Sequence, residues 1–233
     1  MKILILQVAT PNIKDYSVYS IPINISYSIK WDYDFLLYTS KEEELDYHPA
    51  WLKITAFYNI NVDKYDWIWV LDADAVINNE KIKLEDIISN CNRPIIISEN
   101  GKNGGRHLNS GSFLIKSEFV KELLLKYEEC VSNNYIFLNK RFWDQELIND
   151  WYEESPEHFS VRKMKELNSH WRIYGPSKEY CLDHGIDYVA PYNQQNNLVH
   201  HFMSLPMDIR INWMKNNWMY KQIELLKKMN IFV

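Results

Sequence analysis

The sequence is most informative at residues 67–74, which read WIWVLDAD. Five consecutive apolar residues, 67–71, are typical of a strand that is buried on both faces of a parallel sheet. The run ends in two carboxylates, Asp72 and Asp74, with only Ala73 between them. Ligands of open α/β sheets bind outside the carboxyl ends of strands, so these carboxylates are predicted to lie at a binding site.

Two carboxylates at this spacing repel each other, and a buried charge is costly unless it is paired or bound to a metal. A hard divalent cation resolves that conflict, because Mg²⁺ or Mn²⁺ takes oxygen ligands and keeps positions open for phosphate oxygens. Asp72 and Asp74 are therefore predicted to hold a divalent cation, Mn²⁺ or Mg²⁺. The alternative is a solvated turn that happens to contain two aspartates.

Outward from this point, apolar runs and helical periodicities alternate along the chain. Further strands are expected at residues 2–8, 35–38, 94–98 and 112–116. Helices are expected at residues 49–61, 84–89, 117–131, 142–153 and 209–229. Short strands are expected near residues 172–174 and 187–190. The alternation predicts a single α/β domain over residues 1–233, with a mostly parallel central sheet flanked by helices.

The bulk composition narrows the class of protein. Of the 233 residues, 46% are hydrophobic and 24% are charged, which is ordinary for a soluble globular protein. The formal net charge of -5, without a basic block, argues against a nucleic-acid partner. Three widely separated cysteines predict free thiols. Neither a signal peptide nor an apolar run of about 20 residues is found, so we expect a soluble cytoplasmic protein. The wealth of Asn, Ile, Lys and Tyr suggests an AT-rich genome of bacterial or viral origin.

Four further motifs surround the aspartates in a fixed order: WLK at residues 51–53, NSGSFL at 109–114, DQ at 144–145 and HHF at 200–202. This ordered set resembles the galactosyl/xylosyltransferase family, which includes yeast α-mannan galactosyltransferases and plant xyloglucan xylosyltransferases. Members carry a W-x-K helix, a WLDAD strand end, an N-x-G-x-FL strand, a DQ helix start and a terminal HF in the same sequence. The match spans residues 50–204, although the eukaryotic members' N-terminal membrane anchor is not seen here.

The resemblance implies a GT-A fold, which is Rossmann-like, and a glycosyltransferase. Residues 1–115 would be the nucleotide-sugar-binding half and residues 116–233 the acceptor half. The expected reaction moves a hexosyl or pentosyl group from a nucleotide-sugar, most simply a UDP-sugar, to a hydroxyl of a glycan or glycoconjugate. The resemblance also implies His201 as the third metal ligand, with His200 as the alternative. Donor sugar, acceptor and oligomeric state stay open.

Asp144 is expected to lie near the anomeric carbon. In a retaining enzyme it would stabilise the oxocarbenium-like state, and in an inverting enzyme it would act as the general base. Glu99 is the second candidate for this catalytic carboxylate. Contacts to the donor or acceptor sugar are expected from four other residues: Asn109, Ser110, Gly111 and Gln145.

The nucleotide part of the donor is assigned to residues near the first strands. Lys53 is a candidate for contact with the diphosphate, as a compact positive charge. Thr10 and Tyr38 lie at the carboxyl ends of the first two expected strands and are candidates for contact with the base. Ala73, between the two aspartates, is counted with the same donor site.

Two other function classes remain open from the sequence. Phosphatases of the haloacid dehalogenase type place a DxD after an apolar strand, with Asp72 then a nucleophile and Asp74 an acid/base. That motif normally follows the first strand, whereas here a βαβ stretch precedes it. The second alternative is a catalytically inactive carbohydrate-binding protein. Retained metal-type carboxylates argue against it, because they would be a cost without a purpose in such a protein.

Overall fold

The structure is a computed structural model, and it describes residues 1–40, 45, 47–100, 106–133, 143–163, 167, 169–170, 198–202, 207–208, 210–212 and 214–215. The short strands expected near residues 172–174 and 187–190 lie outside these ranges, as do residues 209, 213 and 216–229 of the helix expected over 209–229. None of the helices within these ranges is long and apolar enough to cross a membrane.

The central sheet has six strands in the order β2-β1-β3-β6-β5-β7. Within the described residues, β6 runs antiparallel to both of its neighbours and the other three pairings are parallel, which confirms a mostly parallel sheet. The strand bounds are β1 (Ile3–Ala9), β2 (Asp34–Thr39), β3 (Trp67–Leu71), β5 (Ile95–Glu99), β6 (Leu108–Lys116) and β7 (Phe159–Arg162). Every residue of β1 and β3 is buried, as their apolar sequences predict.

A second, smaller sheet has the order β4-β9-β8. Its strands are β4 (Ala75–Ile77), β8 (Ser169–His170) and β9 (Val199–His201). Strand β4 follows β3 after the aspartate turn and pairs antiparallel with β9, so that Ala75 lies opposite His201. The sequence analysis missed all three strands, because two or three residues are too few to show a periodicity.

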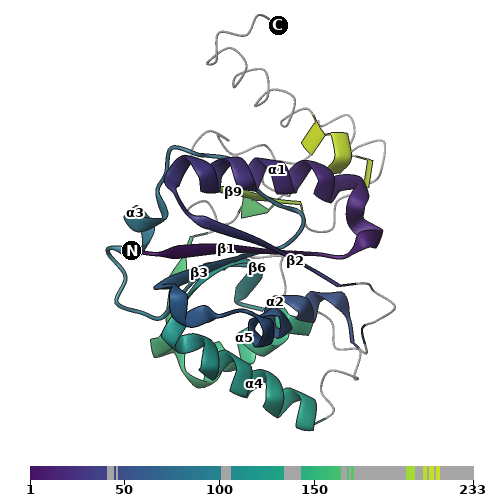
Figure 1. Ribbon diagram of the computed structural model, residues 1–233. Helices are drawn as coiled ribbons and strands as arrows, with labels where there is room; N and C mark the ends of the chain where they lie inside the picture. Colours follow the sequence, from purple (N-terminus) through teal and green to yellow (C-terminus); the bar gives the residue numbers. More distant parts are fainter. Residues whose placement is uncertain are drawn as a thin grey trace, which may run out of the picture.

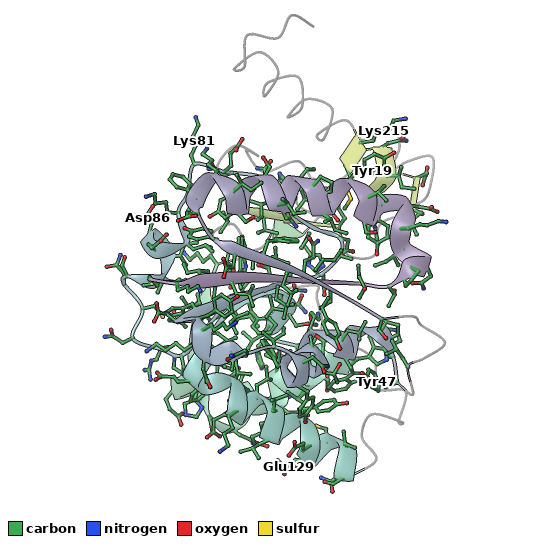
Figure 2. All side chains as sticks on the ribbon, in the orientation of Figure 1. Tyr19, Tyr47, Lys81, Asp86, Glu129 and Lys215 are labelled. Carbon is green, nitrogen blue, oxygen red and sulfur yellow. The ribbon has the colours of Figure 1, made fainter. Side chains whose placement is uncertain are left out.

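Helices cover both faces of the central sheet (Figure 1). Helix α1 (Lys14–Trp31) covers one face, while α2 (Leu52–Thr55), α4 (Val120–Ser132) and α5 (Trp143–Glu154) cover the other. Figure 2 shows Tyr19 on α1 and Glu129 on α4 on opposite sides of the sheet. The remaining bounds are α3 (Leu84–Ile88) and the 3₁₀ turns η1 (Pro11–Ile13), η3 (Pro49–Trp51), η4 (Ala56–Asn59), η5 (Val62–Lys64), η6 (Ser117–Phe119) and η7 (Pro156–His158).

The longest described helix, α1, was not predicted from the sequence. Its buried side carries polar residues such as Ser20 and Asn24, while Val18 and Ile29 face the solvent with exposed fractions of 53% and 74%. Pro22, inside the helix, adds a signal that normally ends helices. A helix with a polar inside and an apolar outside does not show the amphipathic pattern on which such predictions depend.

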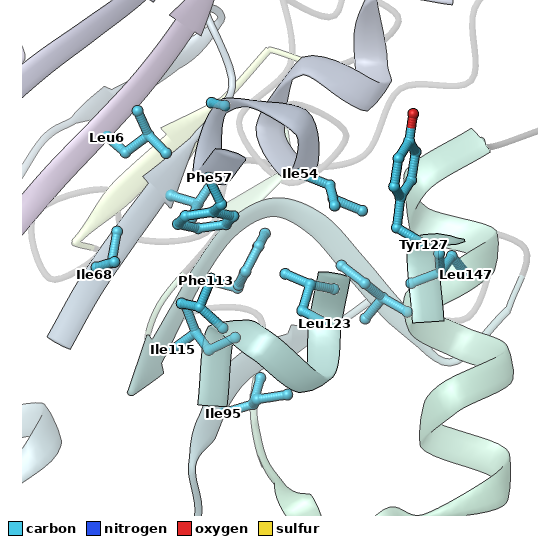
Figure 3. Close-up of a cluster of buried hydrophobic side chains, with 14 of the residues drawn as sticks. Leu6, Ile54, Phe57, Ile68, Ile95, Phe113, Ile115, Leu123, Tyr127 and Leu147 are labelled. Carbon is cyan, nitrogen blue, oxygen red and sulfur yellow. The ribbon is translucent and has the colours of Figure 1, made fainter. Parts of the chain in front are cut away.

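On the face opposite α1, apolar side chains from several strands and helices form a core (Figure 3). Ile54 from α2, Phe113 from β6, Leu123 from α4 and Leu147 from α5 belong to one buried cluster. Burying a side chain of this size contributes about 1.5–3 kcal/mol. This packing fixes α2 and α5 against β6, and therefore fixes the polar residues that these elements carry at one edge of the sheet.

Candidate metal and donor site

Three expected metal ligands come together at the carboxyl end of β3. Asp72 follows the last residue of β3, Asp74 precedes β4, and His201 ends β9. One ligand atom from each residue lies within 4.8 Å of the others. Nε2 of His201 is 3.4 Å from Oδ2 of Asp72 and 3.2 Å from Oδ1 of Asp74. The cluster joins residues that are far apart in the sequence.

The pairing of β9 with β4 places His201, and not His200, on the side of the aspartates. In the pairing with β4, His201 lies opposite Ala75 and His200 opposite Val76. Successive strand residues point to opposite faces, so only one of the two histidines faces the aspartates. The backbone nitrogen of Phe202 donates to the carbonyl oxygen of Asp74 at 3.1 Å and ties the end of β9 to the aspartate turn.

Gly111 makes room for the imidazole of His201. A Cβ atom at this position would lie 2.0 Å from Cε1 of His201, which is closer than real contacts allow. The carbonyl oxygen of Gly111 also accepts a hydrogen bond from the backbone nitrogen of Asp72 at 3.0 Å. The register between β5 and β6 shifts in this region, between Ile97 and Ser98, a type of irregularity that is common next to functional sites. The sequence predicted that Gly111 approaches the sugar, whereas here its missing side chain leaves space for a metal-type ligand.

Positive groups surround the two carboxylates. Burial opposes their ionisation, yet Lys53 and His201 hold the pKa of Asp72 below its usual range. The pKa of Asp74 is likewise lowered against the effect of burial, by His201 and by Arg210, whose Nη1 lies 3.3 Å from Oδ2 of Asp74. Burial lowers the pKa of His201, but the two carboxylates outweigh it and raise that pKa to about 9.

The chemistry of this group fits a divalent cation. Two carboxylates and one imidazole converge from three elements, and the exposed fraction of His201 is only 2%. The two carboxylates that raise the pKa of His201 would interact favourably with a cation at the same place as well. Oxygen ligands with one imidazole suit Mn²⁺ better than Mg²⁺.

Lys53 is buried and bridges two carboxylates. Its Nζ lies 2.7 Å from Oδ1 of Asp72 and 2.7 Å from Oδ2 of Asp144, and it also donates to the carbonyl oxygen and Oγ of Ser110. The two carboxylates raise the pKa of Lys53 in spite of burial, so the ammonium stays charged. Burial raises the pKa of Asp144, Asp72 adds to this effect, and Lys53 opposes it. The sequence predicted a diphosphate contact for Lys53, but the structure places it inside the protein.

The residues that were expected to contact the sugar form one hydrogen-bonded group. Oε1 of Gln145 accepts from Nδ2 of Asn109 at 3.1 Å and from the backbone nitrogen of Ser110 at 3.3 Å. One turn later on α5, Oδ1 of Asn149 accepts from the backbone nitrogen of Leu108 at 2.9 Å. These bonds fix the first turns of α5 to β6 and place Asp144 beside the same strand.

A cavity of about 310 Å³ lies next to the aspartates. Thr10 and Ala73, two of the expected donor-site residues, belong to its lining. The full lining is Val8, Ala9, Thr10, Asn12, Ile13, Tyr16, His48, Pro49, Ala50, Leu52, Asp72, Ala73 and Asp74. A concave site at the carboxyl ends of parallel strands is where α/β proteins bind ligands.

Tyr38 and Glu99 are not brought into this group. Tyr38 is absent from the cavity lining, and its hydroxyl accepts a hydrogen bond from Nδ2 of Asn59 at 2.9 Å. Glu99 is exposed at the end of β5, and β6 separates that strand from β3. Their assigned roles in base contact and catalysis stay predictions.

Several residues of the site were missed by the sequence analysis. Arg210 packs over the ring of Tyr16, with its Cζ 4.7 Å from the ring centroid, and so reaches Asp74. His48 lines the cavity and stacks flat on Trp143 at a centroid distance of 3.6 Å. Trp143 has a φ of 40°, which is rare for a bulky residue, at the position directly before Asp144. The positive φ at the start of α5 is the feature that marks Trp143, and no sequence pattern predicts this feature.

No family model and no curated protein match the sequence. Solved structures match in fold. A glycosyltransferase involved in the glycosylation of the major capsid of PBCV-1 is 15% identical with a TM-score of 0.72, and the match covers 92% of this chain and 100% of that one. The galactosyltransferase LgtC, in complex with donor and acceptor sugar analogues, is 10% identical with a TM-score of 0.51, covering 91% and 95%. Mouse xyloside xylosyltransferase 1 is 13% identical with a TM-score of 0.51, covering 88% and 98%. The chain therefore has the GT-A glycosyltransferase fold, as the sequence predicted.

Proposed function

We propose that this protein is a metal-dependent glycosyltransferase that moves a sugar from a nucleotide-sugar, most simply a UDP-sugar, to a hydroxyl of a glycan or glycoconjugate. One observation carries the proposal. Asp72, Asp74 and His201 converge beside a 310 Å³ cavity at the carboxyl end of the sheet, in a fold shared with glycosyltransferases. Each half of the chain supplies part of this group, so the donor half, 1–115, depends on a ligand from the acceptor half, 116–233.

The cavity provides a place for the nucleoside, with Thr10 and Ala73 in its lining. The diphosphate would then lie toward the carboxylates, and a divalent cation held by Asp72, Asp74 and His201 would supply Lewis-acid stabilisation of the leaving nucleoside diphosphate. Arg210 lies at the same place, 3.3 Å from Asp74, and its planar guanidinium is suited to phosphate oxygens. We assign Arg210 to the diphosphate in place of the buried Lys53.

Asp144 is the proposed carboxylate for the anomeric carbon. Lys53 holds it on one side, and the hydrogen-bonded pair Asn109 and Gln145 lies beside it. Buried side chains that are fixed in this way keep a reacting sugar in one orientation. The two stereochemical courses assign Asp144 different roles, as stabiliser of the oxocarbenium-like state or as general base.

The contacts of Asp72 disfavour the phosphatase alternative. A nucleophilic carboxylate needs an oxygen that is free to attack phosphorus. In this structure Oδ1 of Asp72 is paired with Lys53 at 2.7 Å and Oδ2 lies 3.4 Å from His201. The convergence of three ligand groups also disfavours a carbohydrate-binding protein without catalysis, which has no use for a cation beside the donor cavity.

Thermal unfolding tests the proposal directly. The melting temperature is measured with UDP, GDP and other nucleotides, each with and without Mn²⁺. A ligand at 100 times its Kd stabilises the native state by about 2.7 kcal/mol. We expect UDP to stabilise the protein only when Mn²⁺ is present, and UDP-sugars can then be screened by their hydrolysis.

The Asp74→Ala variant gives the matched test of the cation site, with Asp63→Ala at an exposed position as the control. We expect the first variant to lose both the Mn²⁺-dependent shift and sugar transfer by at least about 100-fold, and the control to keep both. Near-normal transfer by Asp74→Ala would contradict the proposal.

A further inference from the structure

The backbone of the aspartate turn is held from outside at four successive positions. The carbonyl oxygen of residue 72 accepts from Nε2 of Gln7 at 3.2 Å, and that of residue 73 accepts from Oγ of Ser20 at 2.6 Å. The carbonyl oxygen of residue 74 accepts from the backbone nitrogen of Phe202 at 3.1 Å. The carbonyl oxygen of residue 75 accepts from Nδ2 of Asn24 at 2.9 Å. Each of the four carbonyls thus accepts a hydrogen bond from a group outside the turn, and that of residue 72 also accepts one from the backbone nitrogen of Ala75 within it.

The three side chains that hold the turn form one buried network. Nδ2 of Asn24 also donates to Oε1 of Gln7 at 3.1 Å, and Oδ1 of Asn24 accepts from the backbone nitrogen of Ile77 at 2.8 Å. The exposed fraction of Gln7, Ser20 and Asn24 is 0% for each. A buried polar network is favourable only when its groups have partners, and these contacts provide them.

The network explains why the buried side of α1 is polar. At the end of β3 the chain leaves the ladder of the central sheet, so the carbonyls of the turn need other partners. An apolar helix face would remove the donors from α1 to the carbonyls of residues 73 and 75, and a buried carbonyl without a partner is unfavourable. Ser20 and Asn24 supply the missing donors from α1, and Gln7 supplies one from β1.

We infer that Gln7, Ser20 and Asn24 are positioning residues for the cation site. By fixing the backbone of Asp72 and Asp74, they keep two mutually repelling carboxylates close together before a cation binds. This inference rests on the proposed function, because it concerns the same cation site. Groups that orient metal ligands typically change metal affinity by 10- to 100-fold when they are removed.

Ser20→Ala is the most direct test, because it removes one hydroxyl and leaves the helix backbone unchanged. Ser28→Ala is the matched control on the same helix: Ser28 is also buried, but among the described residues its Oγ bonds only to the carbonyl oxygen of Ile25 within α1, at 2.7 Å. The Kd for Mn²⁺ is measured from the electron paramagnetic resonance signal of free Mn²⁺, and the melting temperature is measured separately. We expect Ser20→Ala to weaken Mn²⁺ binding about 10-fold and Ser28→Ala to leave it unchanged.

A second variant, Asn24→Asp, keeps the acceptor for Ile77 and removes the donor for the carbonyl of residue 75. It is expected to weaken Mn²⁺ binding by at least the same factor. Equal Mn²⁺ affinity in wild type and Ser20→Ala, with only a lower melting temperature in the variant, overturns the inference while the proposed function stands. A wild-type protein that binds no Mn²⁺ at all overturns both.

Discussion

Helices α1 and α4 lie on opposite faces of the same sheet and bury different kinds of residue. Helix α4 buries Val120, Leu123 and Tyr127, which are all apolar or aromatic and follow helical spacing. Helix α1 buries seven residues, of which four are polar: Tyr16, Ser17, Ser20, Ile23, Asn24, Tyr27 and Ser28. One helix packs against a hydrophobic core, whereas the other also makes hydrogen bonds to a turn that carries candidate metal ligands.

This difference between α1 and α4 predicts which substitutions should change cation affinity and which should change only stability. Changes in the α4 layer should alter the free energy of unfolding and leave cation affinity alone. Changes on the inner side of α1 should also weaken cation binding, since they act on the aspartate turn. The comparison can be sharpened at positions where both layers offer the same substitution.

The largest effect on stability is expected at Lys53, which extends from α2 to the site. Lys53→Met leaves the half-buried carboxylate of Asp72 and the buried carboxylate of Asp144 without their shared cation, and breaking a buried ion pair costs about 3–5 kcal/mol. The control is Lys126→Met on α4, where a partly exposed lysine pairs with Glu154. Urea unfolding should show less than about 1 kcal/mol for the control. Equal losses of unfolding free energy in the two variants would show that the ion pairs of Lys53 stabilise the fold no more than an exposed pair does.

Within α4, Leu123→Ala is expected to lower the free energy of unfolding by about 3 kcal/mol, because it opens a cavity in the core shown in Figure 3. The Kd for Mn²⁺ should not change. Leu125→Ala, on the same helix but 50% exposed, should cost less than about 1 kcal/mol. A loss of Mn²⁺ affinity in Leu123→Ala would contradict the expectation that the α4 layer does not affect cation binding.

At Gly111, the added methyl group would occupy the place of the His201 imidazole. We expect Gly111→Ala to weaken Mn²⁺ binding by about 10- to 100-fold, since the ligand must move while the two aspartates stay. Calorimetric titration with Mn²⁺ measures this change. Unaltered affinity would mean that His201 does not contribute to the cation site.

The smallest effect is expected on the outer side of α1. Ile29 is 74% exposed, so Ile29→Ser should change the free energy of unfolding by no more than about 0.5 kcal/mol. Chemical denaturation measures it. A larger loss would mean that this apolar outer side is covered in solution.

The sequence predicted best those parts of the fold that carry a strong apolar pattern. Strand β3 and helix α4 were found because a continuous apolar run and an amphipathic period are local signals. Helix α1 was missed because its buried side carries polar residues that hydrogen-bond to the carbonyls of residues 73 and 75. Gln7 gave one usable signal, as the single polar residue in the strand ILILQVA.

The sequence predicted the residues that make up the candidate metal site, but not the ion pairs that join it to distant segments. Asp72, Asp74 and His201 are brought together as the resemblance implied. The bridge from Lys53 to Asp144 and the contact of Arg210 with Asp74 depend on side chains from distant segments, which no local pattern records. These long-range pairs, rather than the motifs, determine the charge state of the group.

The residues of the candidate cation site are synthesised at different times. Lys53, which pairs with Asp72, precedes it in the chain and leaves the ribosome first. The partners of Asp74, His201 and Arg210, leave the ribosome much later. The group of three ligands is therefore complete only once β9 pairs with β4, so binding of a cation by all three would require the nearly complete chain.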